Sequence, residues 1–195
     1  MTTWIEEPSG GRDRGIRGIG RAWVEVMTHP RRFFTTGIGE GDQGPGLTFA
    51  IVVASGFISG WLVTSPAVIP GIAESRLLSG VVTVLAVSFL AAPAALHLTA
   101  ALTTISLIVT TTDRSGVSQT VQVVAYATAP MALAGPPIPL LRVVCAGYGI
   151  GLLMFGLRRI HRASWPRILL ASAVPGLFAF GVAYRGVAAV RTLTG

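Results

Sequence analysis

The stretch "YATAPMALAGPPIP", from Tyr126 to Pro139, sets four prolines in a run that is otherwise apolar enough to form a membrane helix. Each proline in a helix interior removes one backbone hydrogen bond and clashes with the carbonyl four residues back, at a cost of about 3 kcal/mol. In lipid, such gaps persist only where neighbouring groups or cavity water satisfy the backbone. We therefore expect Pro130 to kink a membrane helix and "GPPIP", residues 135–139, to end it in a tight outer turn.

This interruption has two interpretations. In the favoured one it makes a bent hairpin that buries Tyr126 against a helix bundle, because no charged residue accompanies the prolines. In the alternative, a discontinuous helix lines a substrate site near the middle of the membrane, as it does in transporters.

The composition places the whole chain in a membrane. Of the 195 residues, 51% are hydrophobic and 12% are charged, whereas about a quarter of the residues in soluble domains are charged. A helix needs about 20 apolar residues to cross the hydrocarbon core, and charge-free stretches of this order recur along the chain. We predict an all-α polytopic bundle of five transmembrane helices, at about residues 46–66, 78–111, 120–140, 143–159 and 167–188.

The basic residues, all fifteen of them arginine, decide between five spans and six. Residues 77–112 can form one over-length helix or two short helices around Pro93. A single crossing leaves eleven arginines on the side of the N-terminus and four on the other side, while a split gives nine against six. Cytoplasmic loops carry the excess of basic residues, which favours five spans with a cytoplasmic N-terminus and an outside C-terminus. The fourth span is short, and Arg142 and Arg158 are expected to reach its two interfaces.

Residues 1–45 are expected to form a cytoplasmic tail, followed by the transmembrane domain at 46–190. No apolar core follows the first arginines until Leu47, which excludes a signal peptide. The segment "RGIGRAWVEVMTHPRRFF", residues 17–34, gathers Trp23 and other apolar residues on one helical face. It predicts an amphipathic helix at about 16–34 that lies on the lipid headgroups, with Phe33 and Phe34 at the interface. The alternative is a linker whose arginines only set the orientation.

The placement of ionisable side chains argues against an enzyme or an ion transporter. Intramembrane catalysis needs such groups at span centres, but the eight acids all lie in the tail or in loops. His97 is well inside a predicted span, and a lone histidine without a nearby acid is more typical of a neutral packing residue. His29 and His161 adjoin arginines and are interpreted as interface residues rather than metal ligands.

No cofactor is expected, and no catalytic residue is assigned. The net charge of +7 is what the positive-inside rule already requires, so nucleic acid is not expected as a partner.

The run from Gly116 to Leu170, "GVSQTVQVVAYATAPMALAGPPIPLLRVVCAGYGIGLLMFGLRRIHRASWPRILL", resembles the Yip domain family. These are small five-span membrane proteins that interact with Rab/Ypt GTPases in eukaryotes, and the likeness is greatest to the prokaryotic members. "DQGP", residues 42–45, echoes an Asp-Leu-Tyr-Gly-Pro motif of the eukaryotic members without its Leu-Tyr pair, which argues against carrying GTPase binding over. The residues that fit the family pattern are Pro30, Phe34, Gly44, Pro45, His97, Gln119, Tyr126, Pro130, Gly135, Pro136, Pro137 and Pro139.

The resemblance implies a non-enzymatic, multi-pass protein of the cell membrane that organises membrane or acts as a scaffold in a trafficking-like role. Its expected partners are membrane lipid, other membrane proteins or further copies of the same chain. The expected cytoplasmic contact residues are Arg31, Arg32, Arg158, Arg159, Arg162 and Arg167. The alternative function is a small transporter or permease for a lipid or a neutral small molecule, with a path near the Pro130 kink and His97.

Overall fold

The computed structural model describes residues 15–111 and 115–195, and within these ranges all regular elements are helical. The remaining parts of the predicted tail and of the loop before Ser115 lie outside the described residues. In chain order the elements are α1 (Gly15–Thr28), α2 (Pro30–Thr36), α3 (Gly44–Thr64), η1 (Pro66–Val68), α4 (Arg76–Ala86), η2 (Val87–Ala91), α5 (Ala92–Thr110), α6 (Val117–Ala127), η3 (Ala129–Leu133), α7 (Pro139–His161), α8 (Trp165–Gly176), η4 (Leu177–Ala183) and α9 (Gly186–Thr194). The elements η1 and η3 are 3₁₀ helices, and η2 and η4 are π-helical turns.

Four helical segments of the described chain are long and apolar enough to cross a membrane. They are α3, the continuous segment α4–η2–α5, α7, and the segment α8–η4. The second of these runs without a break for 35 residues, Arg76–Thr110, so the division into two short helices around Pro93 is wrong. The π turn η2 ends just before Pro93. Such a turn helps a helix continue where proline removes a donor.

The fourth expected span is longer than the sequence suggested. Residues 143–159 were expected as a short helix, but α7 has 23 residues because it begins at Pro139, the last proline of the cluster. Proline is favoured at a first helical position, where its missing N–H costs nothing. Arg142 therefore lies inside the helix and is only 6% exposed, so protein surrounds its side chain, and its place at the membrane interface stays a prediction.

The third expected span, 120–140, is not one kinked helix. Helix α6 has 11 residues and ends at Ala127, before Pro130, and the chain continues as the 3₁₀ helix η3. Proline at position 130 cannot donate to the carbonyl of Tyr126, and Thr128 closes the end of α6 by donating its N–H and hydroxyl to Ala125 O, at 3.1 and 2.6 Å. Five spans are thus not confirmed by helix length alone.

The broken segment α6–η3 nevertheless lies along α3 in the same direction. A Cβ atom built on Gly46 would lie 3.0 Å from the Cα of Gln122, and one built on Gly60 would lie 3.3 Å from the Cα of Gly135. The interval from 46 to 60 corresponds to about 21 Å of helix. Residues 122–135 cover this same length, although they are not one continuous helix.

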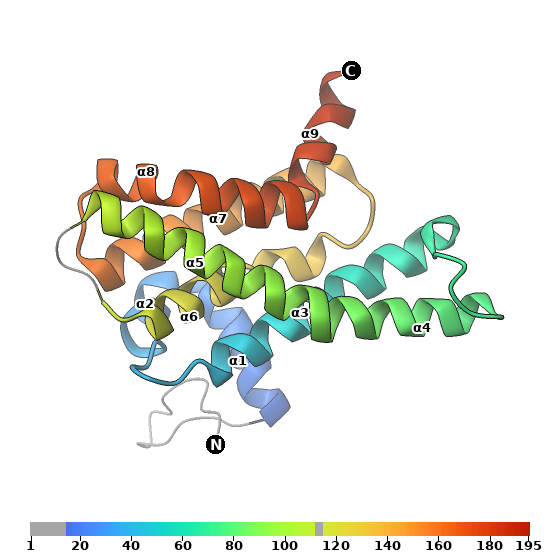
Figure 1. Cartoon of the computed structure of the whole chain (residues 1–195), viewed down its shortest axis with the longest axis horizontal. Helices are drawn as coiled ribbons and strands as arrows, with labels where there is room; N and C mark the ends of the chain where they lie inside the picture. Colours follow the sequence, from blue (N-terminus) through green and yellow to red (C-terminus); the bar gives the residue numbers. More distant parts are fainter. Residues whose placement is uncertain (1–14, 112–114) are drawn as a thin grey trace.

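The bundle around this segment is arranged so that α5 lies along α8, with α7 behind them (Figure 1). The N-terminal helices belong to it, since α1 packs against η3 and α2 packs against α7. Tyr126 is fully buried, with its ring centroid 4.7 Å from that of Phe33 and 4.9 Å from that of Phe49. At the far end, α9 turns away from η4 and packs against α7, and its C-terminal end projects from the bundle (Figure 1).

The close backbone approach between α3 and the turn after η3 can be tested with Gly135→Ala. The new Cβ would lie 2.7 Å from Phe57 O and 2.9 Å from Gly60 Cα, so backbone must move. We expect the free energy of unfolding, measured by denaturant titration in mixed micelles, to fall by about 1–3 kcal/mol. The control is Gly147→Ala on the exposed face of α7, where a Cβ meets nothing within 4 Å. This variant should gain about 0.5–1 kcal/mol, and equal behaviour of the two would contradict the close packing.

Candidate functional site

The chain between α6 and α7, residues 128–138, interrupts the helix and is called the break. A buried arginine binds two of the backbone carbonyls that lose their helical partners there. Arg142, in the first turn of α7, donates from Nε to Ala134 O at 3.0 Å and from Nη2 to Gly135 O at 2.7 Å. In hydrocarbon an unsatisfied carbonyl costs several kcal/mol. The guanidinium, with its fixed fork of donors, therefore stabilises the end of the broken segment as well as the start of α7.

Two arginines meet at the indole of Trp61, near the end of α3. The Arg142 guanidinium carbon lies 5.1 Å from the Trp61 ring centroid and 5.4 Å from that of Phe57, while the Arg185 carbon lies 4.7 Å from Trp61. Cations are attracted to aromatic faces, and more strongly where water is excluded. Among residues 15–111 and 115–195, no ion pair joins either arginine to a carboxylate. This end of the bundle therefore carries uncompensated positive charge.

The N-terminal segment supplies a third donor to the break. Trp23 in α1 donates from Nε1 to Ala129 O at 2.8 Å, and Ala22 and Val26 on the same face are fully buried. Phe33 and Phe34 in α2 are also buried, so their expected place at the membrane interface is wrong. The other face of α1 is exposed, and its contact with headgroups stays a prediction.

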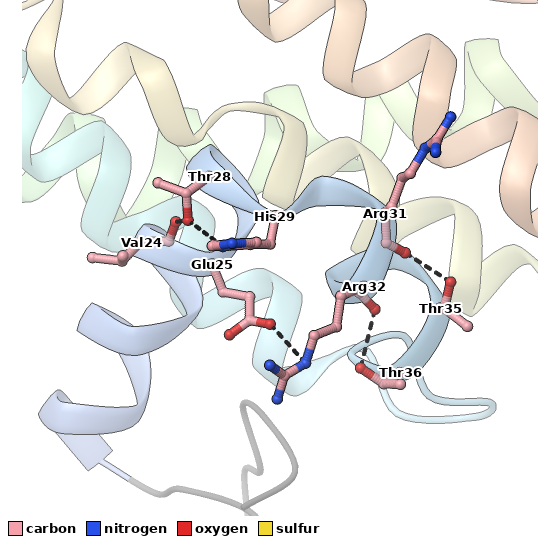
Figure 2. Close-up of polar contacts among 8 residues, drawn as sticks. All are labelled: Val24, Glu25, Thr28, His29, Arg31, Arg32, Thr35 and Thr36. Atoms are coloured by element: carbon pink, nitrogen blue, oxygen red, sulfur yellow. Dashed lines mark hydrogen bonds and ion pairs between the residues drawn. The ribbon is translucent and has the colours of Figure 1, made fainter.

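The expected helix at 16–34 is two helices, α1 and α2, which meet at His29 and Pro30. Figure 2 shows this corner, where the Thr28 hydroxyl lies 2.8 Å from His29 Nδ1 and Glu25 forms an ion pair of 3.1 Å with Arg32. Arg31 and Arg32 point in different directions, Arg32 toward Glu25 and Arg31 away from it (Figure 2). The pair of arginines expected as one contact surface is thus divided.

The other residues that fit the family pattern are dispersed. Gln119 accepts from the Gly116 N–H at the start of α6, at 3.3 Å. Gly44 and Pro45 begin α3, and Pro136 and Pro137 lie in the turn between η3 and α7. The structure does not bring His97 to the buried Pro130: the imidazole is exposed on α5 and lies 2.8 Å, through Nδ1, from Pro93 O.

An apolar cavity of about 290 Å³ lies among α3, η2, α5, α6 and η4. Both π turns contribute to its wall, through Val87 and Ala91 of η2 and through Ala179 and Ala183 of η4. Such turns are frequent at functional sites. His97 does not line this cavity, so it offers no support for a path that joins His97 to the break.

A second cavity, of about 250 Å³, lies at the opposite end of α7 and is lined by Phe155, Arg158, Arg159, Arg162 and Ala163. Arg159 donates from Nε to Thr35 Oγ1 of α2 at 3.0 Å, and the Arg158 guanidinium carbon lies 4.6 Å from the Trp165 ring centroid. We call Arg158, Arg159 and Arg162 the basic pocket. All three line the same space, which is large enough for an anionic group.

Several important residues were missed or misread in the sequence. Gln122 was not singled out, yet its amide accepts from Gly39 N at 3.1 Å and donates to Gly39 O at 2.6 Å. His161 was expected at the interface but is buried, where Ser115 N donates to its Nδ1 at 3.1 Å. A polar residue inside an otherwise apolar helical face is the signal that could have indicated Gln122 and Arg142. Within the described ranges, no group of three or more metal-ligating side chains is present.

The role of Arg142 predicts the effect of Arg142→Met, which keeps an apolar stem and leaves two carbonyls without their donors. We expect the free energy of unfolding in micelles to fall by about 1–3 kcal/mol for each carbonyl. Arg191→Met, at an exposed position in α9, serves as the control and should change stability by less than about 0.5 kcal/mol. If both variants unfold alike, the arginine does not hold the break.

The role of Trp23 predicts that Trp23→Phe loosens α1 from the bundle, because phenylalanine keeps the ring but lacks the donor to Ala129 O. The loss should be about 1–3 kcal/mol, and trypsin should then cut faster at Arg17 and Arg21. Val24→Ala, on the exposed face of the same helix, provides the comparison. Unchanged cleavage in Trp23→Phe would show that this hydrogen bond does not dock α1.

The comparisons with known proteins agree with this architecture at the level of the family. Residues 24–184 match the Yip1 domain, and this interval contains the break, both cavities and the last five residues of α1. No curated protein and no solved structure matches the chain. Since the match covers most of the sequence, this multi-pass membrane protein belongs to the Yip1 domain family.

Proposed function

We propose that this chain is a non-enzymatic protein of the cell membrane that binds anionic lipid headgroups at its cytoplasmic face and thereby organises the surrounding membrane. The observation that carries the proposal is the basic pocket. Three arginines at and just after the end of α7 line it, at the bundle end where α2 and the start of α8 also lie (Figure 1).

The basic pocket is partly pre-organised for a phosphate. Arg159 donates a hydrogen bond to Thr35, and the Arg158 guanidinium stacks on the ring of Trp165. Arginine presents a planar fork of donors that matches phosphate oxygens, and fixing such a side chain before binding lowers the entropic cost of contact. Arg167 near the start of α8 and Arg31 on α2 add positive charge at the same end of the bundle (Figure 1).

We further propose five membrane crossings with the N-terminus in the cytoplasm and the C-terminus outside. The third crossing would be the broken segment α6–η3, whose course along α3 supports a path through the same depth. The excess of loop arginines on the side of the basic pocket supports its cytoplasmic placement. Membrane proteins or further copies of this chain could then share the same face as partners.

The proposal predicts the behaviour of the double variant Arg158→Gln/Arg162→Gln, which leaves the Arg159–Thr35 contact in place. Each arginine near an anionic surface contributes about 1 kcal/mol, so the affinity for phosphatidylglycerol should fall about thirtyfold. The measurement is native mass spectrometry of the full chain, titrated with phosphatidylglycerol or phosphatidylcholine at low and high salt. The wild type should prefer the anionic lipid, and this preference should weaken with salt.

The matched control is Arg76→Gln/Arg191→Gln, which removes the same charge from exposed positions outside the pocket. It should bind phosphatidylglycerol as the wild type does. Equal loss in both doubles would indicate a response to net charge alone, and an unchanged affinity in Arg158→Gln/Arg162→Gln would remove the proposed headgroup site. Loss of co-purifying proteins without any change in lipid binding would instead assign the pocket to a protein partner.

A further inference from the structure

The apolar cavity owes its space to small side chains and irregular turns. Seven of its sixteen lining residues are alanines, drawn from α3, η2, α5 and η4. Ser88 of η2 is buried and receives a hydrogen bond from Ser55 of α3 at 2.7 Å, so the π turn is tied to the bundle. The cavity is therefore bounded by packed elements rather than by one loose loop.

The cavity opens toward lipid. Ala91 at the end of η2 and Ala183 at the end of η4 line it, and both are also exposed at the surface of the bundle. These residues belong to two segments long and apolar enough to cross the membrane. What meets this opening in a bilayer is hydrocarbon, so the chemistry of the occupant is that of an acyl chain.

One end of the cavity is polar and positive. Trp61, Tyr184 and Thr128 at the end of α6 line this part of the cavity. The Arg142 and Arg185 guanidiniums lie over the Trp61 ring without an ion pair to any carboxylate of the described residues. Arg142 is engaged by the Ala134 and Gly135 carbonyls, whereas Arg185 is exposed. Arg185 is thus the group placed to meet an anionic head.

We propose that this cavity binds one acyl chain of an anionic lipid or fatty acid, which enters between Ala91 and Ala183 and places its negatively charged head at Arg185. The volume of about 290 Å³ is at the lower end of the range of about 300–1,000 Å³ for ligand sites, which suits a single hydrocarbon chain. This site lies apart from the basic pocket and goes beyond headgroup binding at the cytoplasmic face.

The experiment uses the full chain reconstituted in vesicles with three photoreactive probes that carry a diazirine in the acyl chain. They are a palmitic acid, a phosphatidylglycerol and a phosphatidylcholine. Crosslinked peptides are mapped by mass spectrometry. We expect labelling to concentrate at residues 87–99 and 179–185, and more strongly with an anionic probe than with phosphatidylcholine.

The decisive variant is Ala91→Phe, which places a ring at the exposed rim. Excluding even about two methylenes from the cavity should lower labelling there about tenfold. The matched control is Ala94→Phe, an exposed alanine three residues on that does not line the cavity, and it should label as the wild type does. Ala183→Phe blocks the opposite rim and repeats the test should Ala91→Phe fold poorly.

The contact between the negatively charged lipid head and Arg185 is tested by comparing Arg185→Gln with Arg191→Gln. Loss of one interfacial arginine should reduce the preference for anionic over zwitterionic probe about fivefold in the first variant only. Labelling by palmitic acid alone identifies a free acid, and labelling by phosphatidylglycerol identifies a phospholipid chain; both support the site. Labelling spread evenly over lipid-facing residues, or equal in Ala91→Phe and Ala94→Phe, would overturn it while leaving the test of the basic pocket unaffected.

Discussion

The structure depends on satisfying the carbonyls of a broken segment inside a membrane bundle. Water cannot solvate these groups in hydrocarbon, so the protein must supply donors. Two come from Arg142 in α7 and one comes from Trp23 in α1. These bonds join the N-terminal helix, the break and the start of α7 into one unit, although Trp23 and Ala129 are 106 residues apart in the sequence.

Arg142 connects this constraint to the candidate ligand site. Its guanidinium is held by carbonyls on one side and by the rings of Phe57 and Trp61 on the other. Both rings also line the apolar cavity. A residue needed to complete the backbone therefore brings positive charge to the end of a space lined by alanines. In hydrocarbon an uncompensated charge is costly, which favours an anion at the neighbouring, exposed Arg185.

The sequence predicted the helical class, a single over-length second span and the family, because hydropathy and proline spacing are local signals. It did not predict that α7 begins at Pro139, because the fourth span was expected to begin after the charged residue Arg142. Only the folded chain shows that its donors reach carbonyls seven and eight residues earlier. Trp23 and Phe34 were misread for a similar reason: an amphipathic pattern indicates an apolar face but does not tell whether lipid or protein covers it.

The folded environment of an arginine also matters for the orientation of the chain in the membrane. The positive-inside rule concerns arginines in loops near the membrane, and the sequence assigned four arginines to the outside. One of these, Arg142, lies within α7 and is bound to the bundle, so it does not count as a loop charge. Without Arg142, three arginines are assigned to the outside and eleven to the side of the N-terminus. The proposed orientation, with the N-terminus and the basic pocket in the cytoplasm, therefore rests on loop arginines alone.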